Sequence, residues 1–341
     1  MIKIYYLVLI LFAVKVYGSF CPENCACVPV EPMKKLKVDC TRIKLQTIPP
    51  ANTWPLNTYS MDLSMNKIRK IDEMESSFDL KYLDLATNEI ESIKPKAFEH
   101  LTQLVALDLS HNILEKVPEQ LLDGLNNIQS LNLSYNKLKY LPENLFAGKK
   151  SLEEVRLAHN PLQIIEPALF QDSPNLKVLD ISSIEAFSFK EGLFHKLEQL
   201  EELDISGNDF TTVPTNSSRS SHRLRVLQIS SNPIRNLDED SFRKLNTLEE
   251  LYIDNMKDLT QIKDKTFSHL YWLRKLSITD NPHLSYIDKH AFIGMHNRSW
   301  LNLKDLSLRS NRLTELSEHA LPWRMFKLLI TNLMILDCRL K

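Results

Sequence analysis

Histidine, tyrosine and arginine side chains recur at a regular spacing in the middle of this 341-residue chain. His111, Tyr135 and His159 are 24 residues apart, with Arg156 just before the last of them and Tyr82 upstream. Tyr and Arg are among the residues that most often anchor protein interfaces. If the fold brings these positions to one surface, they form a recognition site for a protein ligand.

Asp108, His111 and Ser134 also offer the acid, the base and the hydroxyl of a hydrolase triad. A repeated sequence places such residues on one face by default, so their presence alone is weak evidence. No G-x-S-x-G elbow occurs, and a shallow repeat surface lacks the water-excluding pocket in which an oxyanion is stabilised. We therefore expect no catalytic residue and no enzyme.

Metal and cofactor chemistry is disfavoured as well. His111 and His159 fall two repeats apart, about 10 Å if each repeat adds one strand. Zn–N bonds of about 2 Å hold two ligating histidines much closer together. The chain has six glycines and neither G-x-x-x-x-G-K nor G-x-G-x-x-G, so a phosphate-binding loop is not indicated. We expect no metal and no cofactor.

Charged residues form a second pattern. Paired carboxylates recur as Glu153-Glu154, Glu201-Glu202 and Glu249-Glu250. A further row consists of Asp62, Asp84, Asp108, Asn132, Arg156, Asp180, Asp204 and Gln228. Two interpretations stay open: a solvated outer face, which every solenoid needs, or a charged recognition surface. The formal net charge of -1 favours neither nucleic acid nor an anionic membrane as partner.

A repeated segment must position these side chains. Leu104–Leu114 has the pattern L-x-x-L-x-L-x-x-N-x-L, and Ile128–Leu138 repeats it. Because side chains alternate along a strand, the leucines point inward and Asp108 and Ser110 outward. The repeats begin at Thr58, Leu80, Leu104, Ile128, Leu152, Leu176, Leu200, Leu224, Leu248, Leu273 and Leu303, with a strict 24-residue step from Leu80 to Leu248.

Two more ladders accompany the leucines. Aromatic residues predicted to stack in the core are Phe98, Phe146, Phe170, Phe194, Phe242, Phe267 and Phe292, with Leu122 and Leu321 as substitutes. Turn asparagines predicted to bond main-chain groups are Asn66, Asn88, Asn112, Asn136, Asn160, Asn208, Asn232, Asn281 and Asn311. The asparagine ladder is interrupted at Ile184 and Met256, where we expect irregular coils.

The N-terminal segment indicates export. Lys3, the apolar run from Ile4 to Val14, and small residues before Ser19 predict a signal peptide at 1–18, rather than a short signal anchor. Four cysteines follow at once: Cys21, Cys25, Cys27 and Cys40. In an exported chain this cluster predicts a disulfide framework, with three connectivities open. Zinc is disfavoured by the C-x-C spacing and the lack of a nearby histidine.

The last residues depart from the repeat. After Leu316 the pattern dissolves, and Cys338 is left without an obvious partner, which predicts an intermolecular bond, a free thiol or an incomplete chain. The apolar run from Leu328 to Leu336 is too short to span a membrane, so we expect no membrane span in this chain. N-glycosylation sequons occur at Asn132, Asn216 and Asn297.

These motifs resemble the extracellular leucine-rich repeat family of animal secreted and cell-surface proteins, such as Toll-like receptor ectodomains and adhesion proteins. The resemblance implies an α/β solenoid: a right-handed superhelix with a parallel concave β-sheet and a mostly irregular or 3-10 convex side. It also implies the pairing Cys21–Cys27 and Cys25–Cys40. The expected division is a signal peptide at 1–18, a cysteine-rich cap at 19–57, about eleven repeats at 58–325 and an incomplete C-terminal cap at 326–341.

The function implied is an extracellular, secreted or cell-surface module that binds a protein ligand on its concave face. The predicted contact residues are Tyr82, Asp108, His111, Tyr135, Glu153, Glu154, Arg156 and His159. The identity of the ligand does not follow from the sequence, and a homo- or heterodimer is compatible with this class. The alternative is a structural matrix protein that acts through assembly, for instance through Cys338.

Overall fold

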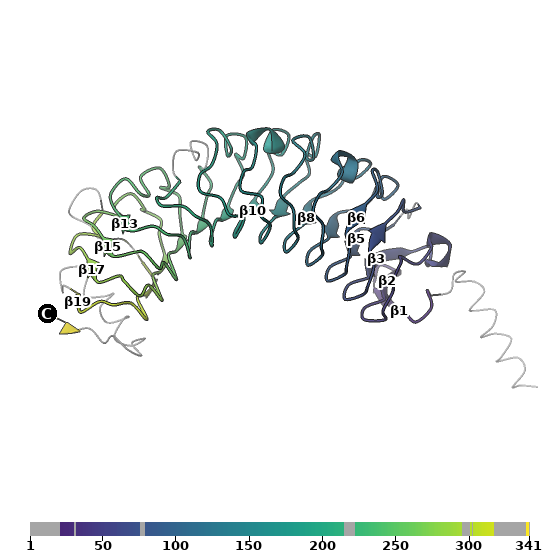
Figure 1. Cartoon of the computed structure of the whole chain (residues 1–341), viewed down its shortest axis with the longest axis horizontal. Helices are drawn as coiled ribbons and strands as arrows, with labels where there is room; N and C mark the ends of the chain where they lie inside the picture. The colour runs from purple at the N-terminus through teal and green to yellow at the C-terminus, as the bar shows by residue number, and fades with distance from the viewer. Residues whose placement is uncertain are drawn as a thin grey trace, which may run out of the picture. The chain divides into compact units, whose positions relative to one another are not determined.

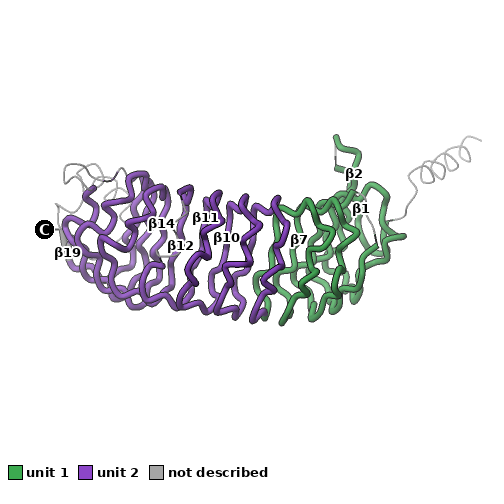
Figure 2. Tube along the Cα trace, turned by 90° about the horizontal axis from the view of Figure 1, so that it is seen from above, with its two compact units in different colours: residues 1–137 green, residues 138–341 purple. Residues whose placement is uncertain are grey.

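The computed structural model describes residues 21–30, 32–75, 79–214, 222–294, 301, 303–316 and 339–340. The predicted signal peptide, the sequons at Asn216 and Asn297, Leu321 and Cys338 lie outside the described residues. The chain divides into two compact units, residues 1–137 and 138–341 (Figure 2). Each unit is a solenoid of stacked coils, as expected.

Unit 1 begins with a disulfide-bonded hairpin. Its two disulfides join Cys21 to Cys27 and Cys25 to Cys40, which is the pairing that the resemblance implies. The antiparallel strands β1 and β2 make up the hairpin, and β2 starts a parallel sheet with the strands that follow. The main sheet of unit 1 consists of β1 (Ala26–Val30), β2 (Lys35–Asp39), β3 (Thr58–Asp62), β5 (Tyr82–Asp84), β7 (Ala106–Asp108) and β8 (Ser130–Asn132).

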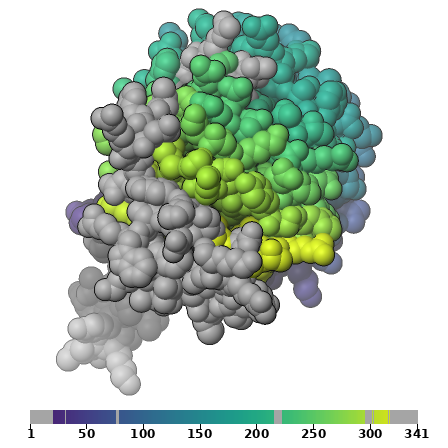
Figure 3. All heavy atoms as spheres, turned by 90° about the vertical axis from the view of Figure 1, so that its left-hand side faces the viewer, coloured from purple at the N-terminus to yellow at the C-terminus, as the bar shows by residue number. Residues whose placement is uncertain are grey.

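Unit 2 continues with one short parallel strand per repeat (Figure 1). Equivalent residues pair across neighbouring strands, for example Leu179 with Leu203 and Leu203 with Leu227. In the space-filling view its coils pack directly one on the next (Figure 3). The main sheet of unit 2 consists of β9 (Glu154–Arg156), β10 (Val178–Asp180), β11 (Glu202–Asp204), β12 (Val226–Gln228), β14 (Glu250–Tyr252), β16 (Lys275–Ser277) and β18 (Asp305–Ser307).

The other side of each coil is mostly irregular. It carries two-residue strands: β4 (Lys70–Ile71), β6 (Ser92–Ile93), β13 (Asn236–Leu237), β15 (Gln261–Ile262), β17 (Tyr286–Ile287), and β19 (Glu315–Leu316) paired with β20 (Arg339–Leu340). Three 3-10 helices complete it: η1 (Ala51–Thr53), η2 (Glu119–Leu122) and η3 (Pro167–Phe170). No helix in the described part of the chain is long and apolar enough to cross a membrane.

The core consists of the predicted ladders. Every described leucine of the strand pattern is buried, and burial of each contributes about 1.5–3 kcal/mol relative to exposure. The predicted phenylalanines are buried, and stacked pairs such as Phe242–Phe267 have ring centroids 5.8 Å apart. Phe210, which is not part of the predicted ladder, is also buried. Its ring centroid lies 4.7 Å from that of Phe189.

Each turn asparagine bonds two coils, as predicted. The Asn112 amide donates to the carbonyls of Leu109 in its own coil and Leu85 in the preceding coil, both at 3.0 Å. Its Oδ1 accepts the main-chain N–H of Ile90 at 2.9 Å. Each of these buried main-chain groups would cost about 1–3 kcal/mol if it were left unpaired. The ladder therefore fixes the turn from which the outward side chains project.

The two interruptions differ from the regular turn to unequal degrees. At both, the asparagine of the next coil takes over: Asn208 accepts the N–H of Ile184 at 3.0 Å, and Asn281 that of Met256 at 2.7 Å. Around Ile184 the backbone is irregular, because Gln163 and Glu185 have additional positive φ angles of 57° and 62°. Around Met256 the preceding residue keeps the regular left-handed conformation, so the departure is smaller than expected.

Candidate functional site

Four rows of side chains follow the main sheet in each unit. We call them the entry row (the residue before each strand), the middle row and the exit row (the two outward residues of each strand), and the turn row (the residue before each ladder asparagine position). The middle row of unit 1 is Ser60, Tyr82, Ala106 and Ser130; that of unit 2 includes Glu154, Val178, Glu202, Val226 and Glu250. The turn row of unit 1 is Met65, Thr87, His111 and Tyr135.

The acidic exit row has a structural task that the sequence analysis did not identify. In seven strands a carboxylate or amide oxygen accepts the main-chain N–H two residues later and so caps the turn. The acceptor and donor pairs are Asp39–Thr41, Asp62–Ser64, Asp84–Ala86, Asp108–Ser110, Asn132–Ser134, Asp180–Ser182 and Asp204–Ser206. The recurring Asp-x-Ser spacing could have revealed it. The Asn132 sequon is the asparagine form of this motif.

In unit 1 the exit row borders a hollow of about 340 Å³ on the sheet face. The hollow forms because the middle-row side chains Ser60, Ala106 and Ser130 are small. Asp84 and Asp108 lie at its edge. Among the described residues neither of these aspartates forms an ion pair. The Asn132 amide donates to Asp108 Oδ2 at 3.0 Å, which leaves the row with its charge.

Electrostatics in this hollow disfavour the ionised carboxyl. Burial raises the pKa of Asp84 above its ordinary value, and the nearby charges of Asp108 and Asp62 raise it further. Lys37 offsets part of this charge at the far end, where its Nζ lies 3.8 Å from Asp62 Oδ2. A cationic group of a ligand that entered the hollow would therefore meet carboxylates with no cation of their own.

Aromatic side chains flank the hollow. The Tyr82 ring meets Tyr59 edge-on at 5.2 Å and is 41% exposed. His111 and Tyr135 stack in parallel, with ring centroids 4.1 Å apart and an interplanar angle of 10°. The recognition residues predicted in this half, Tyr82, Asp108, His111 and Tyr135, all lie on the sheet face of unit 1 or at its edge.

The stacked pair occupies strained backbone. His111 and Tyr135 have φ angles of 53° and 55°, in the left-handed region that costs an ordinary residue about 1–2 kcal/mol. In unit 2 the same row contains His159 at 54° and also Gly207 at 67°, a residue that adopts this region without strain. A bulky tyrosine is thus held where glycine or asparagine fits best, and its ring is 45% exposed.

The structure corrects the predicted orientation of one residue. Ser110 does not face outward: it is 5% exposed, because the chain turns inward after Leu109. Ser134 is equally buried, and its Oγ has no hydrogen-bond partner among the described residues. The Ser134 hydroxyl is therefore not paired with a base, and Asp108, His111 and Ser134 do not form the arrangement of a hydrolase triad.

In unit 2 the carboxylate pairs are neutralised by cations from intervening repeats. Along the entry row, Lys177 bonds Glu153 at 2.7 Å, and Arg225 lies between Glu201 at 3.7 Å and Glu249 at 3.0 Å. The hydrogen bond from Arg225 lowers the pKa of Glu249. Sequence inspection found the glutamates but did not pair them with Lys177 and Arg225.

The other predicted residues of unit 2 join the same network. Arg156 Nε bonds Glu154 Oε1 at 2.6 Å, within one strand. In the middle row Lys275 lies 3.7 Å from Glu250 and 5.0 Å from the centre of the Tyr252 ring. His159 is exposed on the turn row. Five of the six paired glutamates of this face thus have a cation as partner, whereas Glu202 and the exit-row Asp180 and Asp204 form no ion pair among the described residues.

Comparison with known proteins agrees with this architecture. A family model described as "Leucine rich repeat" matches residues 56–114, 102–162, 150–210, 198–256 and 246–305. "Leucine-rich repeat-containing protein 3" of Bos taurus is 35% identical over 95 residues, which are 27% of this chain and 35% of that protein. The chain thus covers about a third of this curated relative.

Solved structures share the fold. The first is titled "Structure of the Toll - Spatzle complex, a molecular hub in Drosophila development and innate immunity"; it has a TM-score of 0.61 and 23% identity, over 81% of this chain and 42% of that chain. The glycosylated form of that complex gives a TM-score of 0.59 and 25% identity, over 77% and 41%.

Proposed function

Because the chain belongs to the leucine-rich repeat family, we propose that it is an extracellular recognition module whose unit 1 sheet face is the main contact for a protein ligand. The contact residues in this proposal are Tyr82, Asp108, His111 and Tyr135. The fold is a non-enzymatic interaction scaffold in this family. A protein ligand is supported by the matched structures, whose title describes a Toll–Spatzle complex.

The observation that carries the proposal is the hollow of unit 1. It combines a recess lined by Tyr82 with two carboxylates, Asp84 and Asp108, that form no ion pair among the described residues. The stacked His111 and Tyr135 lie on the turns that follow two of its strands. A ligand binds where its groups replace water at little cost and where hot-spot aromatics surround a desolvated centre. The unit 2 face, including Glu153, Glu154, Arg156 and His159, would instead have to break existing ion pairs to bind through its charges. We assign it a secondary contact role.

Export is part of the same proposal. Two disulfides in the first coil suit an oxidising compartment. The proposed organisation keeps a signal peptide at 1–18, a cap at 19–57, repeats at 58–325 and a terminal segment at 326–341. Glycans are proposed at Asn216 and Asn297. A glycan at Asn132 would replace an amide hydrogen beside Asp108 and would project into the hollow.

The test is a binding screen with matched variants. The protein, displayed as a multimer, is screened against an array of secreted and cell-surface proteins. Each hit is then measured against Asp84→Asn/Asp108→Asn, in which the amide keeps the turn cap, as Asn132 does in its own strand. Ser110→Ala is added to this variant and to the control, because Asp108→Asn would otherwise create an N-glycosylation sequon with Ser110. The control is Glu119→Gln in η2, an exposed carboxylate outside the sheet face.

We expect the double variant to weaken the true interaction at least tenfold, and the control to leave it unchanged. Equal affinity for all three proteins would remove the unit 1 face from the proposal. Loss of binding only with Glu153→Lys/Glu154→Lys/Arg156→Glu would transfer the site to unit 2.

A further inference from the structure

Two carboxylates and an imidazole converge on the flank of unit 1, away from the sheet face. Glu73 comes from one coil, and Glu99 and His100 come from the next. The His100 Nε2 atom lies 3.1 Å from Glu73 Oε1 and 3.7 Å from Glu99 Oε1. All three side chains are accessible, with Glu99 the most covered at 29% side-chain exposure.

One proton cannot satisfy this arrangement. Nε2 carries at most one hydrogen, which points along one direction and serves one oxygen well. If it bonds Glu73, the Glu99 oxygen facing the same nitrogen stays without a donor from His100. Lys96 reaches the other oxygen of Glu99 at 3.3 Å and offsets one of the two negative charges. With a neutral imidazole the cluster therefore keeps net negative charge, and one carboxylate oxygen near Nε2 has no donor from His100.

We propose that Glu73, Glu99 and His100 bind a zinc ion. Zn–N and Zn–O bonds of about 2.0–2.2 Å place neighbouring ligands of a tetrahedral ion about 3.3–3.6 Å apart. The two distances from Nε2 bracket this range. The donor set of one imidazole and two carboxylates suits zinc, and water occupies the fourth position. The ion replaces the Nε2 proton and bonds both oxygens at once.

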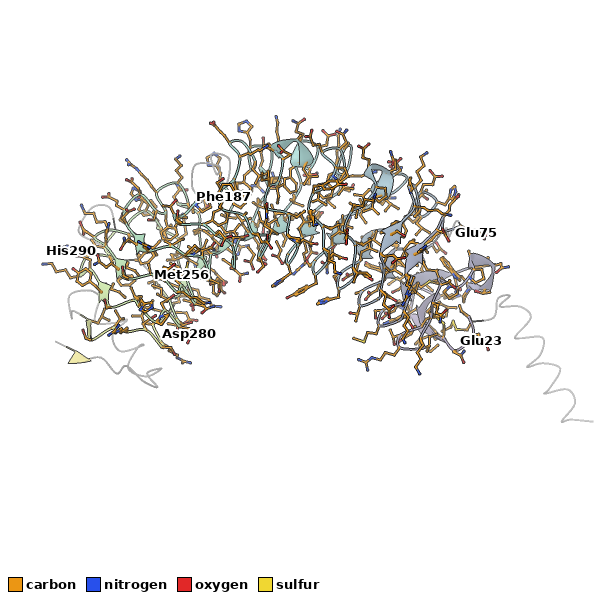
Figure 4. All side chains as sticks on the ribbon, in the orientation of Figure 1. Glu23, Glu75, Phe187, Met256, Asp280 and His290 are labelled. Carbon is orange, nitrogen blue, oxygen red and sulfur yellow. A yellow bond between two sulfur atoms is a disulfide. The ribbon has the colours of Figure 1, made fainter. Side chains whose placement is uncertain are left out.

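A second cluster in unit 2 provides an internal comparison. The ligand atoms of Asp264, Asp288 and His290 also lie close together. Figure 4 shows His290 on one side of this region; Asp280, which is not part of the cluster, lies on the other side. Both oxygens of Asp288 are already used: one accepts the His290 main-chain N–H at 2.8 Å and the other the Tyr286 hydroxyl at 2.9 Å. Zinc binding there has to compete with these bonds, so the unit 1 cluster binds more tightly.

A zinc ion at this place would link two consecutive coils next to the disulfide-bonded cap. A ligand that binds only the folded state stabilises it in proportion to the logarithm of its concentration over Kd. Zinc should therefore raise the melting temperature.

The experiment is a calorimetric titration of ZnCl2 into the purified, untagged, EDTA-treated protein at pH 7.4. The variants are His100→Gln and Glu73→Gln, and the controls are His290→Gln and Glu89→Gln, whose carboxylate pairs with Arg69 on the same side of unit 1. Circular dichroism verifies that each variant is folded.

We expect one zinc equivalent with a micromolar Kd, weakened at least tenfold by His100→Gln and by Glu73→Gln, and unchanged in both controls. Absence of binding to the unaltered protein overturns the proposal. Binding that survives His100→Gln, or that is lost in His290→Gln, overturns it as well.

Discussion

The sheet faces of units 1 and 2 have the same strand register but opposite surface character. In unit 1 the middle row is mainly small, so the exit-row carboxylates border a hollow. In unit 2 the entry and middle rows have long charged side chains that pair between repeats. The difference lies in the partners of the acidic residues: the neighbouring repeats supply cations to the glutamates of unit 2 but none to Asp84 and Asp108. Our proposal places the ligand contact where such a cation is lacking.

Exposed ion pairs contribute little to stability, about 0–1 kcal/mol each. The ion pairs of unit 2 therefore contribute little to folding, but their glutamates are less available to a ligand because each already has a cation as partner. In unit 1, by contrast, Asp84 and Asp108 form no ion pair among the described residues. We therefore predict the effects of substitutions that change the hollow of unit 1 or the ion pairs of unit 2.

The largest effect is expected from filling the hollow. Ala106→Arg places a long cation in the middle row of unit 1, next to Asp84 and Asp108, and so gives this face the paired character of unit 2. Ligand affinity should fall about 100-fold, or about 2.8 kcal/mol. Surface plasmon resonance measures it, with Val178→Arg in the middle row of unit 2 as the matched control. A larger loss with Val178→Arg would reverse the assignment of the two faces.

A smaller effect is expected at the stacked pair. Tyr135→Asn removes the ring but suits the left-handed backbone, which asparagine tolerates better. Affinity should fall about tenfold, as for a typical interface aromatic. The free energy of unfolding should stay within about 1 kcal/mol, because relief of backbone strain offsets the lost stacking. A strongly destabilised variant with normal affinity would make Tyr135 a residue of the scaffold.

In unit 2, removal of the cation that two glutamates share should lower stability slightly and leave ligand affinity unchanged. Arg225→Ala leaves Glu201 and Glu249 without their common partner. Because these side chains are largely exposed, the loss in unfolding free energy should stay below about 1 kcal/mol and shrink in high salt. Urea unfolding at two salt concentrations measures it. Reduced ligand affinity in this variant would show that the lattice itself is recognised.

The buried aspartates of the exit row should affect stability in the same way in both units. Burial raises the pKa of Asp84 and of Asp204 in the folded state. A raised carboxyl pKa opposes folding above that pKa, and the cost disappears as the pH falls through it. Asp84→Asn, and Asp204→Asn in a Ser206→Ala background that avoids the sequon the substitution would create with Ser206, should therefore each increase stability at pH 7 relative to the matched parent protein, with a difference that narrows in acid. Thermal unfolding across this range is the measurement, and a constant difference would contradict it.

The fold was predictable because its determinants are periodic. Leu107, Asn112 and their equivalents recur at fixed spacing, so one repeat indicates the register of all. The disulfide pairing followed from the family resemblance, not from the spacing alone. The outward positions of Tyr82 and Asp108 followed from strand alternation, whereas His111 and Tyr135 lie on turns and were grouped by their 24-residue spacing alone.

Other features could not be found in this way, because they depend on contacts between coils. The pairing of Arg225 with Glu249 joins residues 24 positions apart, and that of His100 with Glu73 joins residues 27 apart. Strand alternation also failed at Ser110, where the strand has already ended and the chain turns inward. The Asp-x-Ser spacing of the exit row is typical of turn caps. A solvated acidic surface has the same composition, so the sequence alone did not distinguish the two.

The central claim is that a protein ligand contacts unit 1 through its sheet face. Hydrogen–deuterium exchange of the complex with the partner from the screen tests it most directly, because it locates the contact without a substitution. The account predicts slower exchange at the turns after β5, β7 and β8, which contain Asn88, Asn112 and Asn136. Protection confined to the strands and turns of unit 2, with unit 1 unchanged, would contradict it.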